Sequence, residues 1–242
     1  FTSGAVYEGS FANGKYNGFG KITASATDNY EYYEGEFVDD EMSGKGKIVF
    51  RDGAIYEGDF SKGKYHGLGV YIYTKAHPFD YYEGEFVFNY RNGRGTLYYK
   101  SGDVYDGEFS HDALHGQGKL IYNEVDSREF FDGIFKNGSM RSGRLVYRNG
   151  TEYIGTWDAN GMNGYGIAIW KSRFGRYWQK YEGYFKNGEF DGRGKMSVLE
   201  RESNYEAKAK EGIWSKGRYS RKLTKKAREN GELDTPLTPP EE

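Results

Sequence analysis

Aromatic and polar residues alternate along most of the chain with the two-residue period of a β-strand. The segment 56–60 (Tyr-Glu-Gly-Asp-Phe) places two rings and a glycine on one face and two acids on the other. The segment 67–73 (Gly-Leu-Gly-Val-Tyr-Ile-Tyr) places two glycines and two tyrosines on one face. A ring on one strand can lie flat over a glycine on the next, because glycine has no Cβ to keep it away. The two segments therefore predict a β-hairpin.

This hairpin unit recurs almost from end to end. Units start near residues 7, 33, 56, 82, 105, 131, 153 and 181, with a half-unit near 210. The starts at 7 and 56, and those at 33 and 82, lie 49 residues apart, so the period is a pair of hairpins. A residue type that tolerates positive φ follows each Phe or Trp by three positions: Gly14, Asp40, Gly63, Asn89, Asp112, Gly138, Asn160 or Gly188. Tight hairpin turns are expected there.

Long and short connectors alternate between the units. The long ones cover residues 24–32, 74–81, 123–130 and 171–180, and we expect them along one edge of the sheet, either as lobes or as about two extra strand residues each. The unit at 131 departs from the pattern. Its turn region reads one residue longer than usual and Leu145 takes the expected place of the second glycine, which predicts a local bend or bulge.

The repeats predict an all-β fold, a single-layer antiparallel meander of about eight hairpins over residues 1–217. The remaining residues, 218–242, differ in character. Ser220 is placed to cap a short basic helix over residues 221–229 that covers the end of the array. The acidic, proline-rich end beyond it is expected to be disordered. The opening residues resemble the end of a preceding unit, so we expect a longer protein.

Composition narrows the classes of partner. The chain has 242 residues, 36 glycines, 24 tyrosines and no cysteine, so thiolate metal sites and disulfides are excluded. Its net charge of −2 gives no support to nucleic-acid binding, which favours a basic surface. Apolar runs fall short of the roughly 18 residues of a transmembrane helix. We therefore expect a cytoplasmic protein without a transmembrane segment.

The repeat also resembles a known family. Tyr-Glu-Gly-x-Phe, a glycine-bearing turn and Gly-x-Gly, recurring about every 23 residues over 7–198 with a half-unit at 211–217, resembles the MORN repeat (membrane occupation and recognition nexus). The resemblance implies an elongated, twisted, trough-like sheet. It also implies an assembly module in junctional, ciliary, cytokinetic or actin- and myosin-linked proteins. Such repeats also precede catalytic domains in some lipid kinases and a lysine methyltransferase.

The sequence does not match the motifs of a phosphate-binding loop, a catalytic carboxylate pair or a metal site. Gly20-Lys21 lacks the following Ser or Thr of a phosphate-binding loop, and Lys15 stands where its first glycine belongs. The acids at the second position of each unit repeat too regularly for a single catalytic pair, so we interpret them as an exposed ladder pairing with lysines or tyrosines. His111 and His115 flank a hairpin turn without a cysteine, which argues against a metal site. We predict no catalytic, metal or cofactor site, and no cofactor.

The repeated rings are the strongest functional candidate. A single-layer sheet has no second layer to cover its apolar face, and an exposed apolar patch marks an interaction surface. The alternative is that the rings are only the hydrophobic core of the sheet. The predicted partner-binding trough consists of Tyr33, Phe37, Tyr56, Phe60, Tyr82, Phe86, Tyr105, Phe109, Tyr153 and Trp157.

Two function classes follow. The first is a non-enzymatic scaffold or adaptor in a cytoskeletal, ciliary or axonemal assembly, which binds a helix or strand of a partner protein, or another copy of itself, in the trough. The second is a membrane tether whose basic residues contact a phosphoinositide or another anionic lipid: Lys222, Lys225, Lys226 and Arg228. A third reading is an accessory module of a larger enzyme.

Overall fold

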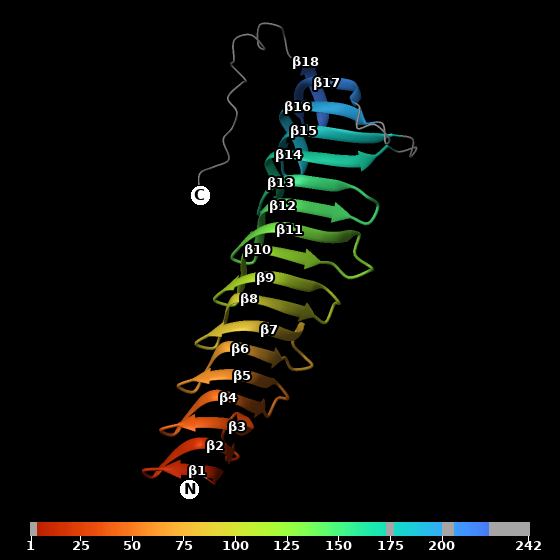
Figure 1. Ribbon diagram of the computed structural model, residues 1–242. Coiled ribbons are helices and arrows are strands. Elements are labelled where there is room, and N and C mark those ends of the chain that lie inside the picture. The colour runs from red at the N-terminus through yellow and green to blue at the C-terminus, as the bar shows by residue number, and fades with distance from the viewer. Residues whose placement is uncertain (1–3, 173–176, 200–205, 223–242) are drawn as a thin grey trace. The chain divides into compact units, whose positions relative to one another are not determined.

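The fold is built from β-strands. The computed structural model describes residues 4–172, 177–199 and 206–222, and in these ranges the chain forms 18 β-strands and no helix. The chain divides into two compact units, which are described separately. Unit 1 holds residues up to 126 together with 134–139, and unit 2 holds residues 127–133 and those from 140 onward. The strands are labelled in Figure 1.

Unit 1 is an antiparallel meander of five complete hairpins, in which each strand pairs with the next along the chain. Its complete strands are β1 (Val6–Ala12), β2 (Lys15–Thr23), β3 (Tyr30–Val38), β4 (Glu41–Phe50), β5 (Ile55–Ser61), β6 (Lys64–Ile72), β7 (Phe79–Val87), β8 (Tyr90–Tyr99), β9 (Val104–Ser110) and β10 (Ala113–Ile121).

Unit 2 continues the same arrangement, with β12 paired to β13 and each later strand to its successor. Its strands are β13 (Glu152–Asp158), β14 (Gly161–Lys171), β15 (Trp178–Lys186), β16 (Glu189–Leu199), β17 (Glu206–Ser215) and β18 (Arg218–Lys222). The boundary between the units falls within β11 (Arg128–Lys136) and β12 (Ser139–Tyr147). The all-β class and the antiparallel single-layer meander predicted from the repeat are confirmed.

The predicted C-terminal helix begins at residues that belong to a strand. Arg221 and Lys222 form the end of β18, which pairs with β17, because the half-unit near 210 completes its own hairpin. The rest of the predicted helix and the acidic tail lie outside the described residues. The division of the chain at residue 218 stays a prediction.

Hairpin turns follow the expected chemistry. Asp39 and Asp40, for example, both have positive φ (50° and 74°), the geometry that a two-residue turn needs to match strand twist. The turn also fastens neighbouring hairpins: Asp40 N–H donates to the Tyr16 carbonyl (3.1 Å), and its carboxylate accepts the Tyr16 N–H (2.8 Å). Asn89 with Tyr65, and Asp112 with Arg91, repeat this pair of bonds.

The turn prediction is wrong at Asn160. Positive φ occurs one residue later, at Gly161 (109°), and Asn160 N–H instead donates to the Asp158 carboxylate (2.8 Å). The Asp158 side chain forms a local turn with its own backbone, so the chain reaches the left-handed region only after it.

The unit at 131 also differs from its prediction. Gly143, rather than a position at Leu145, takes the place of the second glycine. It pairs with Gly155 as Gly46 pairs with Gly58, and an added Cβ there would lie 2.9 Å from the Phe131 ring. Gly143 lies five positions after the turn glycine Gly138, whereas Gly69 lies six positions after Gly63, so this hairpin is shorter by one residue, not longer.

The connectors explain the two-hairpin period. Strands that follow a long connector start three residues before the unit, at Tyr30 and Phe79, whereas β5 starts one residue before it. The long connectors therefore add two strand residues, as one of the two interpretations predicted. The next short connector then binds the loop: Arg51 donates to the carbonyls of Asp28 (2.9 Å) and Ser25 (2.9 Å), and Lys100 Nζ donates to that of Lys75 (2.9 Å).

Candidate functional site

The ten predicted trough residues lie in the interior of their units. All are buried, with exposures that range from 0% for Tyr33 to 8% for Trp157. In the fully buried tyrosines the hydroxyl is used internally: Tyr33 donates to the Glu36 carbonyl (2.9 Å) and Tyr82 to the Glu85 carbonyl (3.0 Å). The same bond recurs at Tyr56, Tyr105, Tyr153 and Tyr181.

Each ring is held over glycines, as the pattern predicted. Gly35 and Gly46 face one another across β3 and β4, and the Tyr33 ring covers both. A Cβ added at Gly46 would lie 2.6 Å from the Tyr33 Cζ. Burial under these contacts raises the pKa of Tyr33, and it raises the pKa of Tyr153 to about 12, because the phenolate form is disfavoured away from water.

The rings also pack edge to face along the sheet. The Tyr33 ring meets Phe37 of its own strand and Phe60 of the next hairpin, each at 5.0 Å and close to perpendicular, a favourable arrangement for aromatic pairs. This arrangement leaves almost no ring surface for a partner. A direct contact role for the ten residues stays a prediction, and the burial favours the alternative that they are the core.

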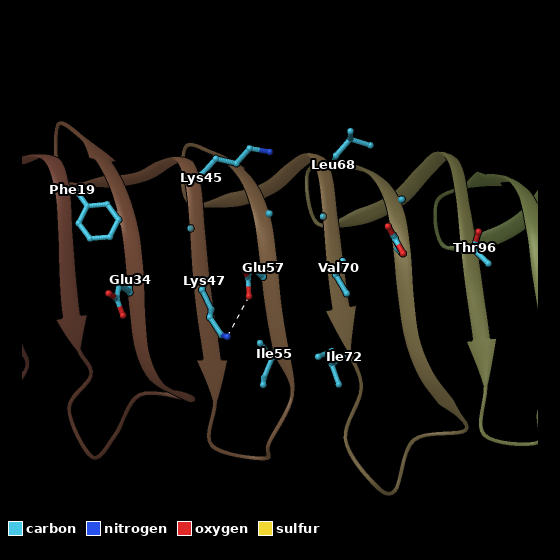
Figure 2. Close-up of a pocket in the computed structure, with 15 residues that line it drawn as sticks. Phe19, Glu34, Lys45, Lys47, Ile55, Glu57, Leu68, Val70, Ile72 and Thr96 are labelled. Atoms are coloured by element: carbon cyan, nitrogen blue, oxygen red, sulfur yellow. Dashed lines mark ion pairs between the residues drawn. The ribbon is translucent and has the colours of Figure 1, made fainter.

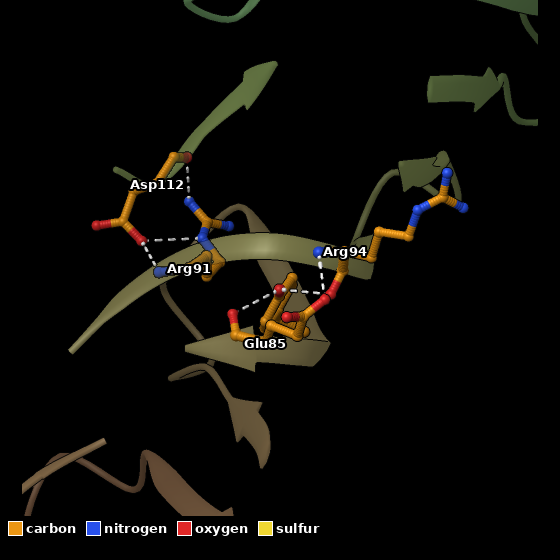
Figure 3. Close-up of polar contacts among 5 residues, drawn as sticks. Glu85, Arg91, Arg94 and Asp112 are labelled. Carbon is orange, nitrogen blue, oxygen red and sulfur yellow. Dashed lines mark hydrogen bonds and ion pairs between the residues drawn. The ribbon is translucent and has the colours of Figure 1, made fainter. Parts of the chain in front are cut away.

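Arg91, whose contacts with Asp112 are drawn in Figure 3, is a local exception on the ring face. It stands where Tyr65 stacks on Tyr56 in the preceding hairpin. Its guanidinium lies 5.1 Å from the Phe79 ring, and it donates to Asp112 from Nε (3.1 Å to the carboxylate) and Nη2 (2.7 Å to the carbonyl). Although a small pocket of about 350 Å³ adjoins it, the chain's own cation already occupies the aromatic cage.

The opposite face of unit 1 carries an apolar row that the sequence analysis did not single out. Its ten members are each directly paired with the next across β1 to β10, and Thr23 is the one that is neither aliphatic nor aromatic. They are Val6, Thr23, Tyr32, Val49, Ile55, Ile72, Tyr81, Tyr98, Val104 and Ile121. Ile72 is 42% exposed, and the rings of Tyr81 and Tyr98 stack at 4.1 Å. We call these residues the apolar row.

A second row lies two residues along the strands and is largely charged. Its cross-strand order is Glu8, Lys21, Glu34, Lys47, Glu57, Val70, Glu83, Thr96, Asp106 and Lys119, and we call it the charged row. Signs alternate as far as Glu57, which pairs with Lys47 at 3.2 Å. Beyond it Val70 and Thr96 replace the cations, so Glu83 has no charged cross-strand neighbour. The predicted pairing of the acids with lysines or tyrosines of neighbouring strands is thus confirmed at Glu57 and, in unit 2, at Glu182, which accepts from the Tyr165 hydroxyl at 2.9 Å. It is absent at Glu83.

A third set of acids on this face is structural. Glu85 Oε1 accepts the Arg94 backbone N–H at 2.8 Å (Figure 3), and Glu36 does the same for Lys45 at 2.9 Å. These carboxylates lie against glycines such as Gly93, whose φ is 90°. They hold the second strand where its backbone turns through the left-handed region.

The two rows together line an open groove of about 1030 Å³ in unit 1 (Figure 2). Ile55 and Ile72 line one side, Glu57, Val70 and Glu83 the middle, and the exposed Leu68 and Phe19 the other side. We call it the unit-1 groove.

Unit 2 has the same ring face but a different opposite face. The positions equivalent to the apolar row are Val146, Glu152, Ile169, Lys180 and Ser197. Glu152 pairs with Arg144 at 2.9 Å, and Lys180 pairs with Glu182 at 2.8 Å. The hydrogen bond from Lys180 lowers the pKa of Glu182. Polar side chains therefore interrupt the row in this unit.

A sequence signal for the apolar row existed. In unit 1 the residue before each repeat tyrosine is Val6, Tyr32, Ile55, Tyr81 or Val104. Because side chains alternate along a strand, this residue lies on the face opposite the ring of the tyrosine that follows it. The register across ten strands was also needed, because only pairing shows that these residues form one line.

The structure gives no side-chain geometry for the predicted lipid-contact residues. Lys225, Lys226 and Arg228 lie outside the described residues, and Lys222 is described only as the end of β18. Across the described ranges, no cluster of His, Cys, Asp and Glu side chains is arranged to hold a metal ion. The same ranges contain no helix long and apolar enough to cross a membrane.

Among the histidines, His77 has a lowered pKa. Burial is the largest cause, and the positive charges of the nearby Lys100 and Arg91 add to it.

Comparison with known proteins identifies the repeat. The family model of the MORN repeat matches seven segments, at residues 7–25, 33–55, 56–75, 82–104, 105–124, 153–173 and 181–197. These segments cover more than half of the chain, and the shortened unit at 131 is not among them. No curated protein shows significant sequence similarity to the chain.

Proposed function

Because this chain belongs to the MORN repeat family, a non-enzymatic type of interaction repeat, we propose that it is a protein-binding scaffold without catalytic activity of its own. The observation that carries this proposal is the unit-1 groove. It combines exposed apolar side chains with fixed charges on a rigid sheet, which is the composition of an interaction surface.

The partner contacts the unit-1 groove and not the aromatic rings. The rings of the ring face are buried against one another, and their hydroxyl groups donate to backbone carbonyls. This face therefore stabilises the sheet that presents the groove. The rings contribute to binding indirectly, because a displaced ring would change the spacing of the strands that carry the groove residues.

Crosslinking mass spectrometry of the full chain tests this function. Lys45 and Lys47 line the groove, whereas the exposed Lys136 and Lys186 lie beside hairpin turns. With an amine-reactive reagent in cell extract, we expect partner crosslinks to concentrate at the first pair. An even distribution over all four lysines, or the absence of any partner crosslink, contradicts the scaffold function.

Membership in a cytoskeletal, ciliary or axonemal assembly is a further part of the proposal. It rests on the family's occurrence in such assemblies and on no contact within this chain. Fluorescence microscopy of the tagged full-length protein tests it, and a diffuse distribution that excludes filaments and cilia contradicts it.

A further inference from the structure

The apolar row and the charged row point to one kind of partner. Building on the proposed scaffold function, we propose that the unit-1 groove binds an amphipathic α-helix of a partner protein, whose apolar stripe lies on the apolar row and whose basic flank reaches Glu83. The helix lies across the strands.

The spacing of the apolar row selects a helix over an extended segment. Adjacent strands lie about 4.8 Å apart, so successive members of the row repeat at that distance. One turn of α-helix advances about 5.4 Å, and one helical side chain therefore meets each strand over several turns. An extended peptide offers a side chain to one face only every 6.8 Å or so, and loses register after two or three strands.

The width of the groove also fits a helix. The apolar and charged rows are two residues apart along each strand, as Ile72 and Val70 are in β6, which corresponds to about 6.8 Å. A helix about 10 Å wide covers both rows at once. The groove runs from Phe19 in β2 to Thr96 in β8, six strand spacings or about 29 Å, which a helix of about 19 residues spans.

The charge of the groove selects a basic partner. Three acids, Glu34, Glu57 and Glu83, and two lysines line the groove. Lys47 pairs with Glu57 at 3.2 Å and Lys45 with Asp59 at 2.7 Å, so neither lysine is directed at Glu83. The neighbouring acids Asp59 and Glu85 are occupied by the backbone N–H groups of Leu68 and Arg94. Glu83 is exposed and meets only Val70 and Thr96 across the strands, so lysine or arginine of a partner has a free carboxylate to reach.

The same charge disfavours two other occupants. A second copy centred on Glu83 would oppose this carboxylate with its own counterpart, and an anionic membrane would be repelled by it. A partner helix with lysine or arginine beside its apolar stripe meets neither obstacle.

A pair of synthetic helices tests the proposal on the full chain. One 18-residue peptide carries a leucine stripe flanked by lysines, and its counterpart replaces every lysine by glutamate. Fluorescence anisotropy measures the binding of each labelled peptide. We expect the lysine peptide to bind at least about tenfold more tightly than the glutamate peptide, because charge complementarity sets specificity.

Matched variants locate the site. Ile72 and Ile154 are both 42% exposed on strands, but only Ile72 belongs to the apolar row. Ile72→Lys should weaken the lysine peptide by about tenfold or more, and Ile154→Lys should change its affinity by less than about twofold. Glu83→Lys should lower affinity for the lysine peptide and raise it for the glutamate peptide, an exchange of preference that a loss of folding does not produce.

Four results overturn the proposal. They are equal binding of the two peptides, no binding of either, equal losses in the two isoleucine variants, and an unchanged preference in Glu83→Lys. A dimer in sedimentation that Ile72→Lys dissociates assigns the face to a second copy. Binding to vesicles of phosphatidylserine that Ile72→Lys removes assigns it to a membrane. If partner crosslinks still concentrate at Lys45 and Lys47, the scaffold function survives while the helical partner is rejected.

Discussion

Units 1 and 2 share one face and differ on the other. Both bury tyrosine or phenylalanine rings over paired glycines, as at Tyr82 and Tyr153. On the opposite face, unit 1 presents the apolar row, in which Thr23 is the one polar member, whereas unit 2 places the charged Glu152 and Lys180 at equivalent positions. The shared face holds the hydrophobic core of each unit, because each buried ring occupies space that a Cβ on the glycines beneath it would fill. The other face differs between the two units, so it is the face to which we assign the proposed partner specificity.

The largest expected difference between the units is their response to alkali. Burial raises the pKa of Tyr33, Tyr56, Tyr82 and Tyr105 in unit 1, and of Tyr153 and Tyr181 in unit 2, where Phe131 takes the third place. Unfolded tyrosine ionises near pH 10. The stabilisation by each buried phenol is therefore complete below pH 10 and is lost as the pH rises towards the raised native value.

Each such tyrosine removes about 1.4 kcal/mol of stability per pH unit above pH 10. Burial also raises the pKa of Tyr65, Tyr71, Tyr73 and Tyr99 in unit 1 and of Tyr165 in unit 2, so unit 1 should unfold at lower pH than unit 2. Circular dichroism gives the transition, and limited proteolysis with mass spectrometry assigns it to a unit. Tyr82→Phe keeps the ring without the proton and should raise the midpoint of unit 1. Simultaneous cleavage of both units would contradict the assignment.

Ring removal tests whether the shared face is equally important in both units. Tyr82→Ser and Tyr153→Ser should each lower the free energy of unfolding by about 3–5 kcal/mol, because each leaves a cavity over a glycine pair. Denaturant unfolding measures the loss, and hydrogen exchange locates it in β7–β8 or β13–β14. A loss of less than about 1 kcal/mol in either variant would show that its ring is not core.

Glycine substitution probes the same packing with a smaller change. Gly46→Ala in unit 1 and Gly166→Ala in unit 2 bring a methyl group within 2.6 Å and 2.8 Å, respectively, of the Cζ of the covering tyrosine. Each should cost about 1–3 kcal/mol through overpacking. Gly63→Asn is the control, since Asn89 already occupies the equivalent turn position with φ of 74° and the change should be nearly neutral. Thermal unfolding of the purified variants measures all three, and a stable Gly46→Ala would refute the close approach.

The smallest expected effect concerns the variable face. Lys180→Ile gives unit 2 an apolar residue at the position that Tyr81 holds in unit 1, and it removes the ion pair with Glu182. Partly exposed pairs contribute little, so stability should change by about 0.5 kcal/mol or less. Chemical denaturation checks this value. A large loss would mean that the opposite face of unit 2 is also fixed by the fold.

Sequence reasoning reached the hairpins because their signals are local. The alternation in residues 56–60, the glycine pair and the turn residues each lie within one unit, and the period confirmed each reading by repetition. It failed where one residue changed the register. Gly143 had to be recognised by its partner Gly155, and Asn160 by the hydrogen bond to Asp158 that moves positive φ to Gly161.

The candidate site was harder to predict than the fold. Rings on an uncovered sheet suggested a surface, but their actual exposure depends on perpendicular packing between hairpins, such as Tyr33 against Phe60, which no single unit encodes. The groove was hard to predict for a different reason. No single groove residue carries a recognisable motif, and these residues form a continuous surface only when the strands pair in register.

The sequence alone determined the repeating hairpin, its antiparallel pairing and the family. The three signals that specify them, side-chain alternation, turn conformation and the packing of an aromatic ring on a glycine, all act within a few residues. The tertiary structure decided which face is consumed in holding the sheet together and which remains available. Exposure is a property of neighbours that are distant in the chain, and cross-strand register is what brings those neighbours together.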